Sequence, residues 1–269
     1  MTRVGRHAPG AVDPLRRNSA GSGRDLAAAA AYADSLLTPK AARAMIPWVH
    51  LDTTTVPDGG GELKLMRRGE EYSIMAGAIE LMNSRLSGSE EALATLVCDR
   101  LTDRPKAHVL IGGYGMGFTL RAALGRLGPA AKVTVGELVP AVVDWARGPM
   151  AHLSAGSLAD PRLAIVIGDV GALIRSGSGS YDAILLDVDN GPEGLSRKAN
   201  NRLYDRDGLG AAKKALRPGG MLSVWSSTPN DAFTERLSRA GFAVEEVRVR
   251  ANGGKRGARH TIWLATKPA

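Results

Sequence analysis

Residues 108–117, HVLIGGYGMG, constrain the fold of this chain more than any other segment. A short apolar run ends in a cluster of glycines, and a helix-like segment, FTLRAALGRL, follows at once. A buried parallel strand that turns sharply into a helix leaves backbone N–H groups facing whatever lies in the turn, and glycine lets the backbone approach a ligand closely. The residues predicted to form this ligand-binding turn are Gly112, Gly113, Tyr114, Gly115 and Gly117.

A second strand, KVTVGE, ends in Glu137, two dozen positions beyond Gly113. An acid at that distance, at the end of the next strand, is placed to accept hydrogen bonds from ribose hydroxyls. The alternative is a solvated acid that caps the helix beginning near Pro140. The turn and the acid together predict a nucleoside-cofactor site, with Glu137 and Leu138 among the cofactor-binding residues.

After residue 105 the sequence alternates between strand and helix patterns. The strands expected are 108–113, 132–137, 163–169, 181–187, 221–227, 242–251 and 259–267, and the helices are 118–127, 139–147, a short turn at 172–174, 208–216 and 231–240. The strands are apolar with little alternation, as expected when helices cover both faces of a parallel sheet. The last two strands have no helix between them, and residues 252–257 suit a hairpin.

This pattern predicts an α/β fold with a doubly wound seven-stranded sheet whose last strand is antiparallel. It is the layout of Rossmann-like S-adenosylmethionine-dependent transferases. A dinucleotide dehydrogenase would repeat the βαβ unit to its end and would need glycine where Phe118 stands.

Before this region the chain divides into two further parts. Residues 1–44 are rich in Arg, Gly, Ser, Pro and then Ala, which predicts a disordered leader followed by a short helix. Residues 45–86 contain four short β-rich runs broken by glycines, which predicts a small antiparallel sheet. Ser87 and Glu90 have the spacing of a helix-capping box, so a helix is expected from there through residue 101, within an α/β domain at 87–269. Met45 is predicted to lie near the start of the folded unit and is a candidate initiation site.

Charge and composition exclude several classes of function. The net charge is +8, but seven Lys/Arg against three Asp/Glu in residues 1–44 supply half of it, and aromatic residues make up only 4%. Nucleic-acid binding is therefore not expected. The single cysteine, Cys98, excludes a disulfide framework, and no histidine shows metal-ligand spacing, so no metal site is expected. No apolar run is long enough to span a membrane, and the protein is predicted to be cytoplasmic.

Ligands of open parallel sheets bind beyond the carboxyl ends of the strands, so polar residues there are site candidates. Asp169 follows the third strand, where it can bind the adenine amino group or simply cap the next helix. Asp187 follows the fourth strand and is predicted to face the reactive end of the cofactor, where a carboxylate can orient an amine or take its proton. Asp189 is either a second catalytic acid or a turn residue. Two serines after the fifth strand, Ser226 and Ser227, are interpreted as rim residues or caps.

These motifs resemble the spermidine synthase family of polyamine aminopropyltransferases, a family within the class I methyltransferase fold. The resemblance covers about residues 46–267 and rests on the glycine-rich turn, Glu137, Gly168-Asp169 and YDAILLD with its acidic loop. It implies that Glu137 binds ribose, that Asp169 holds adenine with Gly168 and Val170 beside it, and that Asp187 is catalytic. It also implies S-adenosylmethionine or its decarboxylated form as cofactor, a small acceptor such as an amine, and a homodimer or tetramer.

Two departures bear on the reaction. The family turn usually reads GGGDGG, with an aspartate that contacts the amine of decarboxylated S-adenosylmethionine, and Gly115 stands in its place. The family also has a Tyr-His/Gln-Glu triplet that helps bind the diamine, and behind Glu71-Tyr72 this chain offers the apolar residues 74–76. We therefore predict methyl transfer from S-adenosylmethionine to a small nucleophile. Aminopropyl transfer and a non-catalytic, nucleoside-binding family member are the alternatives.

Overall fold

The computed structural model describes residues 46–188, 191–192, 201–252 and 257–269. The predicted leader and Asp189 lie outside these residues, and the proposed boundaries at residues 44 and 86 stay predictions. Residues Pro47–Ala269 form one compact unit, which contains all the strands and helices of the described part of the chain. Within that part, no helix combines the length and apolar character needed to cross a membrane.

Seven strands form the large sheet, in the order β10-β11-β9-β8-β5-β6-β7. The parallel ones are β5 (His108–Gly112), β6 (Lys132–Glu137), β7 (Leu163–Ile167), β8 (Tyr181–Leu186) and β9 (Leu216–Ser226). Strand β11 (Arg259–Thr266) runs antiparallel to both β9 and β10 (Ala243–Arg250). The predicted seven-stranded sheet with an antiparallel last strand is confirmed.

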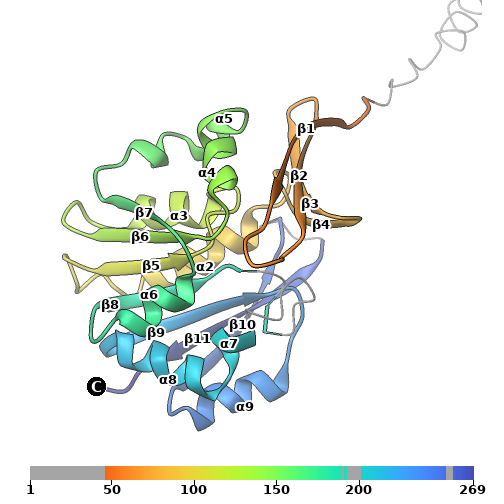
Figure 1. Cartoon of the computed structure of the whole chain (residues 1–269). Helices are drawn as coiled ribbons and strands as arrows, with labels where there is room; N and C mark the ends of the chain where they lie inside the picture. Colours follow the sequence, from red (N-terminus) through yellow and green to blue (C-terminus); the bar gives the residue numbers. More distant parts are fainter. Residues whose placement is uncertain (1–45, 189–190, 193–200, 253–256) are drawn as a thin grey trace, which may run out of the picture. The chain divides into compact units, whose positions relative to one another are not determined.

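Helices cover both faces of this sheet (Figure 1). They are α2 (Gly88–Cys98), α3 (Phe118–Arg126), α4 (Pro140–Arg147), α5 (Ala151–Ser154), α6 (Val170–Ser176), α7 (Asn201–Tyr204), α8 (Arg206–Ala215) and α9 (Asp231–Arg239), with a 3₁₀ turn at Ser157–Ala159. Val109 and Ile111 of β5 pack into one hydrophobic cluster with α2 and α3, while Leu110 packs into a second one with α8 and α9. Burial on both faces is the reason why the strand sequences do not alternate.

The strand order places two chain segments side by side at the middle of the sheet. The chain runs outward from β5 through β6 to β7, and then returns to the other side of β5 as β8. The ends of β5 and β8 pair in register, Gly112 with Leu186. Ligands of doubly wound sheets bind at this kind of switch point, so the glycine-rich turn and Asp187 come together there.

A separate antiparallel sheet precedes the α/β part, in the order β1-β2-β3-β4. Its strands are β1 (Val49–Thr55), β2 (Glu62–Arg68), β3 (Glu71–Ala76) and β4 (Ile79–Asn83). The β2–β3 and β3–β4 hairpins turn at Gly69 and Gly77, both with positive φ. Leu65 and Ile74 lie opposite each other and are fully buried, which gives this sheet one apolar face.

Strand β8 is anchored where it begins. The carboxylate of Asp182, which is 3% exposed, accepts hydrogen bonds from the His108 backbone N–H (2.7 Å), from Arg104 Nη1 (2.8 Å) and from Arg217 Nη1. These partners come from β5, from the loop before it, and from β9. One buried acid therefore ties the starts of three strands together.

Three local predictions differ from the structure. Helix α2 ends at Cys98, not at residue 101, and the side chain of Ser87 makes no capping hydrogen bond, so the predicted capping box does not form. Strand β9 begins at Leu216, five residues before the predicted start. This extension is hard to predict because the β8–β9 register shifts after the pair Tyr181–Leu216 and resumes at Ala183–Met221.

Candidate active site

The glycine-rich turn has a backbone that other residues adopt with strain. Gly113, Gly115 and Gly117 have φ values of 86°, 56° and 82°. A Cβ on Gly113 would lie 2.6 Å from the carbonyl oxygen of Asp187, so this position also needs glycine for its close approach to the end of β8. The turn and the residue after β8 are thus packed against each other.

Glu137 connects the end of β6 to this turn. It is 7% exposed, and its Oε1 and Oε2 atoms accept hydrogen bonds from the backbone N–H groups of Val139 and Tyr114, both at 2.8 Å. Burial raises the pKa of Glu137, and these backbone donors oppose that effect. The predicted alternative, a solvated acid, is wrong because this carboxylate is buried. Ribose binding stays a prediction.

Asp169 caps helix α6. Its Oδ1 accepts a hydrogen bond from the Gly171 backbone N–H (2.9 Å), and its Oδ2 pairs with Arg175 at 3.1 Å. The capping interpretation is therefore confirmed, and the contact with adenine stays a prediction. Asp169 also lines a cavity at the carboxyl ends of the parallel strands, the main cavity, together with Gly168 and Val170.

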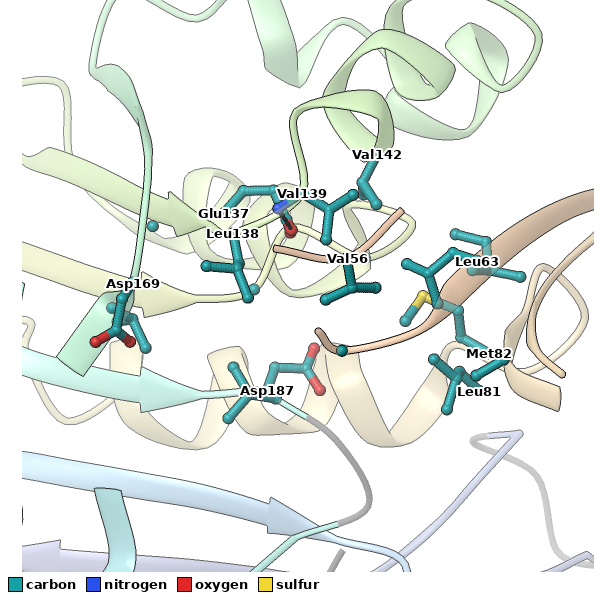
Figure 2. A pocket seen from close by; sticks show the side chains of 18 of the residues that line it. Val56, Leu63, Leu81, Met82, Glu137, Leu138, Val139, Val142, Asp169 and Asp187 are labelled. Carbon is teal, nitrogen blue, oxygen red and sulfur yellow. Dashed lines mark hydrogen bonds between the residues drawn. The ribbon is translucent and has the colours of Figure 1, made fainter. Parts of the chain in front are cut away.

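The main cavity brings together most of the predicted cofactor-binding residues (Figure 2). One side is formed by residues at or just after the ends of the parallel strands, namely Gly113, Gly115, Glu137, Leu138, Gly168, Asp169, Val170 and Asp187. Its apolar side is formed by residues from the first sheet and from α4, among them Val56, Leu63, Ile74, Leu81, Met82 and Val142. Gly112 and Gly117 do not line this cavity; they lie at the end of β5 and at the start of α3, on either side of the turn. Tyr114 lines a second, adjoining pocket with Asp187.

Asp187 extends from the end of β8 into both pockets. Its Oδ2 accepts a hydrogen bond from Thr119 Oγ1 on α3 at 2.6 Å. Burial raises the pKa of Asp187 to about 6, which the bond from Thr119 partly offsets. Of the acids predicted to lie in the site, Asp187 is the one that lines both pockets beside the glycine-rich turn.

Glu90 is a site residue that the sequence reasoning missed. It lies on α2 and lines the second pocket with Asp187, Phe118 and Trp225. Burial, and next the charge of Asp187, raise the pKa of Glu90 to about 7. The capping-box interpretation of Glu90 is thus replaced by a place in the pocket. The sequence does contain a signal for this position. The apolar residue Leu93 lies three positions after Glu90, so both share one face of the helix, and that face is buried in the structure.

Two other predictions change with the geometry. The apolar residues 74–76 predict a site without an acid for an amine, but Glu90 from α2 places a carboxyl group in the second pocket. Ser226 is predicted to be a rim residue or a cap, and it is only 2% exposed, so it is not on the rim. Met82 Sδ lies 3.2 Å from where a Cβ on Gly115 would be, so a thioether occupies the space beside that glycine.

Comparison with known proteins agrees with this fold. The structure resembles a solved spermidine synthase in complex with the transition state analogue AdoDATO, with a TM-score of 0.63 and 19% identity over 81% of this chain and 72% of that one. The fold is therefore that of the spermidine synthases. The family model for the spermine/spermidine synthase domain matches residues 89–235, and the chain belongs to this family.

Two curated relatives share part of the sequence. Putrescine N-methyltransferase 3 from Nicotiana tabacum is 37% identical over 127 residues, which are 45% of this chain and 31% of the relative. A polyamine aminopropyltransferase from Mycobacterium tuberculosis is 28% identical over 193 residues, which are 68% of this chain and 35% of the relative. The matched region spans about a third of the length of each relative.

Proposed function

We propose that this protein binds S-adenosylmethionine in the main cavity and transfers its methyl group to a small amine held in the second pocket. The observation that carries the proposal is the pair of half-buried carboxyl groups, Glu90 and Asp187, that line the same pocket next to the glycine-rich turn. Polar groups of this kind, with raised pKa values and in a cleft, are characteristic of functional sites.

The residues of the main cavity fit the adenosyl part of such a cofactor. The carboxylate of Glu137 is oriented by backbone N–H groups, among them those of Val139 and Tyr114, and an ionised carboxylate has about four acceptor sites, so it can also accept a ribose hydroxyl. Leu138 and Val170 offer apolar contacts on the cavity wall for an adenine ring. The relatives include methyl and aminopropyl transferases, and the solved structure holds an analogue named as a transition state mimic.

The acid pair suits a cationic acceptor. An ammonium group between Glu90 and Asp187 favours their charged forms and lowers both pKa values, so amine binding is expected to release protons. A carboxylate there can then take a proton from the ammonium and free its lone pair for attack. A sulfonium cofactor supplies an electrophilic carbon and a neutral thioether leaving group, so the remaining task of the protein is alignment and exclusion of water.

The surroundings of Gly115 favour methyl transfer over aminopropyl transfer. Where the family has an aspartate that contacts the amine of the decarboxylated cofactor, this chain has no side chain, and the sulfur of Met82 lies close by. Burying an ammonium against a thioether without a counter-charge is unfavourable. Aminopropyl transfer is the second candidate, because Glu90 and Asp187 could pair with the aminopropyl ammonium instead.

The proposal is tested by calorimetry with S-adenosylmethionine and with its decarboxylated form, followed by mass spectrometry of putrescine and related amines after incubation. We expect preference for S-adenosylmethionine and an amine that gains a methyl group. Preference for the decarboxylated cofactor, or a gain of an aminopropyl group, would select the second candidate. Binding of neither cofactor would refute both.

A further inference from the structure

A chain of hydrogen bonds leads from the second pocket into the terminal hairpin. Ser89 Oγ donates to Glu90 Oε2 at 2.9 Å, and His260 Nδ1 lies 2.9 Å from the same Ser89 Oγ. Ser89 is 1% exposed, whereas the ring of His260 is partly exposed. The three side chains therefore connect a carboxyl group inside the pocket to a titratable ring nearer the surface.

The fold holds these groups together although 171 positions separate Ser89 from His260. The Gly88 backbone N–H donates to the carbonyl of Ala251 at 2.9 Å, which ties the start of α2 to the end of β10. The indole of Trp225, which lines the same pocket as Glu90, meets the His260 ring edge-on with centroids 4.7 Å apart. Strands β9, β10 and β11 and helix α2 thus fix the position of the imidazole.

We propose that Ser89 and His260 form a relay that carries to solvent the proton that the acceptor amine gives to Glu90. This inference rests on the proposed function. The ammonium loses one proton to the Glu90 carboxylate, and the nitrogen keeps the electron pair with which it forms the new bond to carbon, while the carbon–sulfur pair leaves with sulfur. Protonated Glu90 then donates to Ser89 Oγ as the serine hydroxyl proton moves to His260 Nδ1. The imidazolium releases its other proton, from Nε2, to water.

The chemistry of each group fits its step. A hydroxyl both donates and accepts, so Ser89 can pass a proton on without holding a charge. Burial lowers the pKa of His260, so the ring is neutral near pH 7 and has a nitrogen that accepts. After the transfer His260 Nδ1–H donates to Ser89 and Ser89 donates to ionised Glu90, which is the serine donation seen in the structure.

No positive charge among the described residues of β10 and β11 lies on the face of the hairpin that holds His260, so none of them opposes transfer of a proton from Glu90 to the imidazole. Arg250 and Arg259 pair with each other one position away from His260, so their side chains lie on the opposite face of the hairpin. On the face of His260, helix α2 contributes Glu90 through Ser89, and β9 contributes the uncharged ring of Trp225. The carboxylate of Glu90 is thus the charged group at the inner end of the relay, from which the proton leaves.

The test compares His260→Asn with wild type, using putrescine as the probe amine. The asparagine amide can still donate to Ser89, but it cannot take up and release a proton. At neutral pH we expect kcat to fall about tenfold or more, with KM for the amine within about twofold and cofactor affinity unchanged. The loss should shrink at higher pH, where the amine arrives without its extra proton. His50→Asn, at an exposed histidine on β1, is the matched control.

Two further variants keep the test independent of folding. Ser89→Ala removes one hydroxyl and should reproduce the kcat loss if His260→Asn melts early. Imidazole in the buffer should restore activity to His260→Ala. Unchanged kcat in His260→Asn, or a loss that is equal at every pH and insensitive to imidazole, would overturn the relay alone. A wild-type protein that binds no sulfonium cofactor would overturn the proposed function itself.

Discussion

At the scale of single residues, Glu90 and Asp187 are costly groups for the fold. Each is a half-buried carboxyl group, and each has a pKa above its ordinary value mainly because burial disfavours the charged form. Thr119 gives Asp187 one strong donor and Ser89 gives one to Glu90, so both acids are oriented as well as buried. Such groups are retained where chemistry needs them.

Replacing Asp187 by asparagine should therefore lower turnover more than binding. The amide keeps the size of the side chain but has no charge with which to orient the ammonium beside Glu90, and we expect kcat to fall roughly a hundredfold or more while cofactor affinity changes little. Initial rates and calorimetry on the same preparation measure both. Asp144→Asn, on the exposed side of α4, should match wild type. A large loss of cofactor affinity with normal kcat would instead make Asp187 a binding residue.

Glu137→Gln should affect binding and stability together. In glutamine an NH2 group replaces one of the two carboxylate oxygens, so one oxygen that accepts from Tyr114 or Val139 becomes a donor and that hydrogen bond is lost. The same change removes one acceptor for a ribose hydroxyl. We expect affinity for the cofactor to fall roughly tenfold to a hundredfold, as for loss of a charged hydrogen bond. Calorimetry and thermal melting check the two effects. Unchanged affinity would show that ribose binds elsewhere.

At the scale of elements, the turn between β5 and α3 is the part whose backbone is most demanding. Gly113→Ala places a Cβ against the carbonyl oxygen of Asp187 in a left-handed conformation, and should cost about 1–3 kcal/mol of unfolding free energy and most of the cofactor affinity. Gly125→Ala, inside α3 with open space around it, should stabilise by about 0.5–1 kcal/mol. Chemical denaturation of both variants measures the contrast. Equal effects would argue against the turn geometry.

The sequence predicts most of these elements because their signals are local. A buried strand followed by glycines and a helix needs only neighbouring residues to be recognised, and so the order of strands and helices after residue 105 is confirmed. Capping is harder to predict, because Ser87 and Asn230 look equally suitable. Only Asn230 caps its helix, with its Oδ1 accepting from the Phe233 N–H at 2.8 Å, whereas Ser87 makes no such bond.

At the scale of the whole molecule, the second pocket depends on residues that are distant in sequence. Glu90, Asp187 and Trp225 come from α2, β8 and β9, and no local pattern connects them. Asp187 was predictable because it follows a strand directly, and Glu90 was not recognised because a charged residue near a helix start has a simpler interpretation. The main cavity is thus largely predictable from sequence, and the second pocket needs the fold.

The buried acids should also shape the pH dependence of stability. The pKa values of Glu90 and Asp187 in the folded protein lie above their ordinary values, so between about pH 4 and pH 7 the folded state holds more protons than the unfolded one. Their contribution to stability therefore falls as pH rises through that window. Glu90→Gln should remove its share and be more stable than wild type at pH 8, by about 1–3 kcal/mol, with little difference at pH 4.

Denaturant unfolding at several pH values measures this difference. The lowered pKa values of the half-buried His108 and His260 act in the opposite direction, since their contribution to the stability of the protein falls as pH falls. The gap between wild type and Glu90→Gln, and not either curve alone, is the quantity to compare. A gap that is constant from pH 4 to pH 8 would contradict the raised pKa of Glu90.

The cluster at the start of β8 has a mechanical consequence for the reaction. Asp182 accepts hydrogen bonds from two arginines and a backbone amide. Asp187 directly follows the same strand, five residues and roughly 16 Å farther along the chain. A strand held at one end resists a slip in register, and a one-residue slip would turn the side chain of Asp187 to the other face of the sheet. The anchor at the amino end of β8 therefore fixes how far Asp187 reaches into the pocket, and in the proposed reaction the alignment of donor and acceptor depends on residues that line neither pocket.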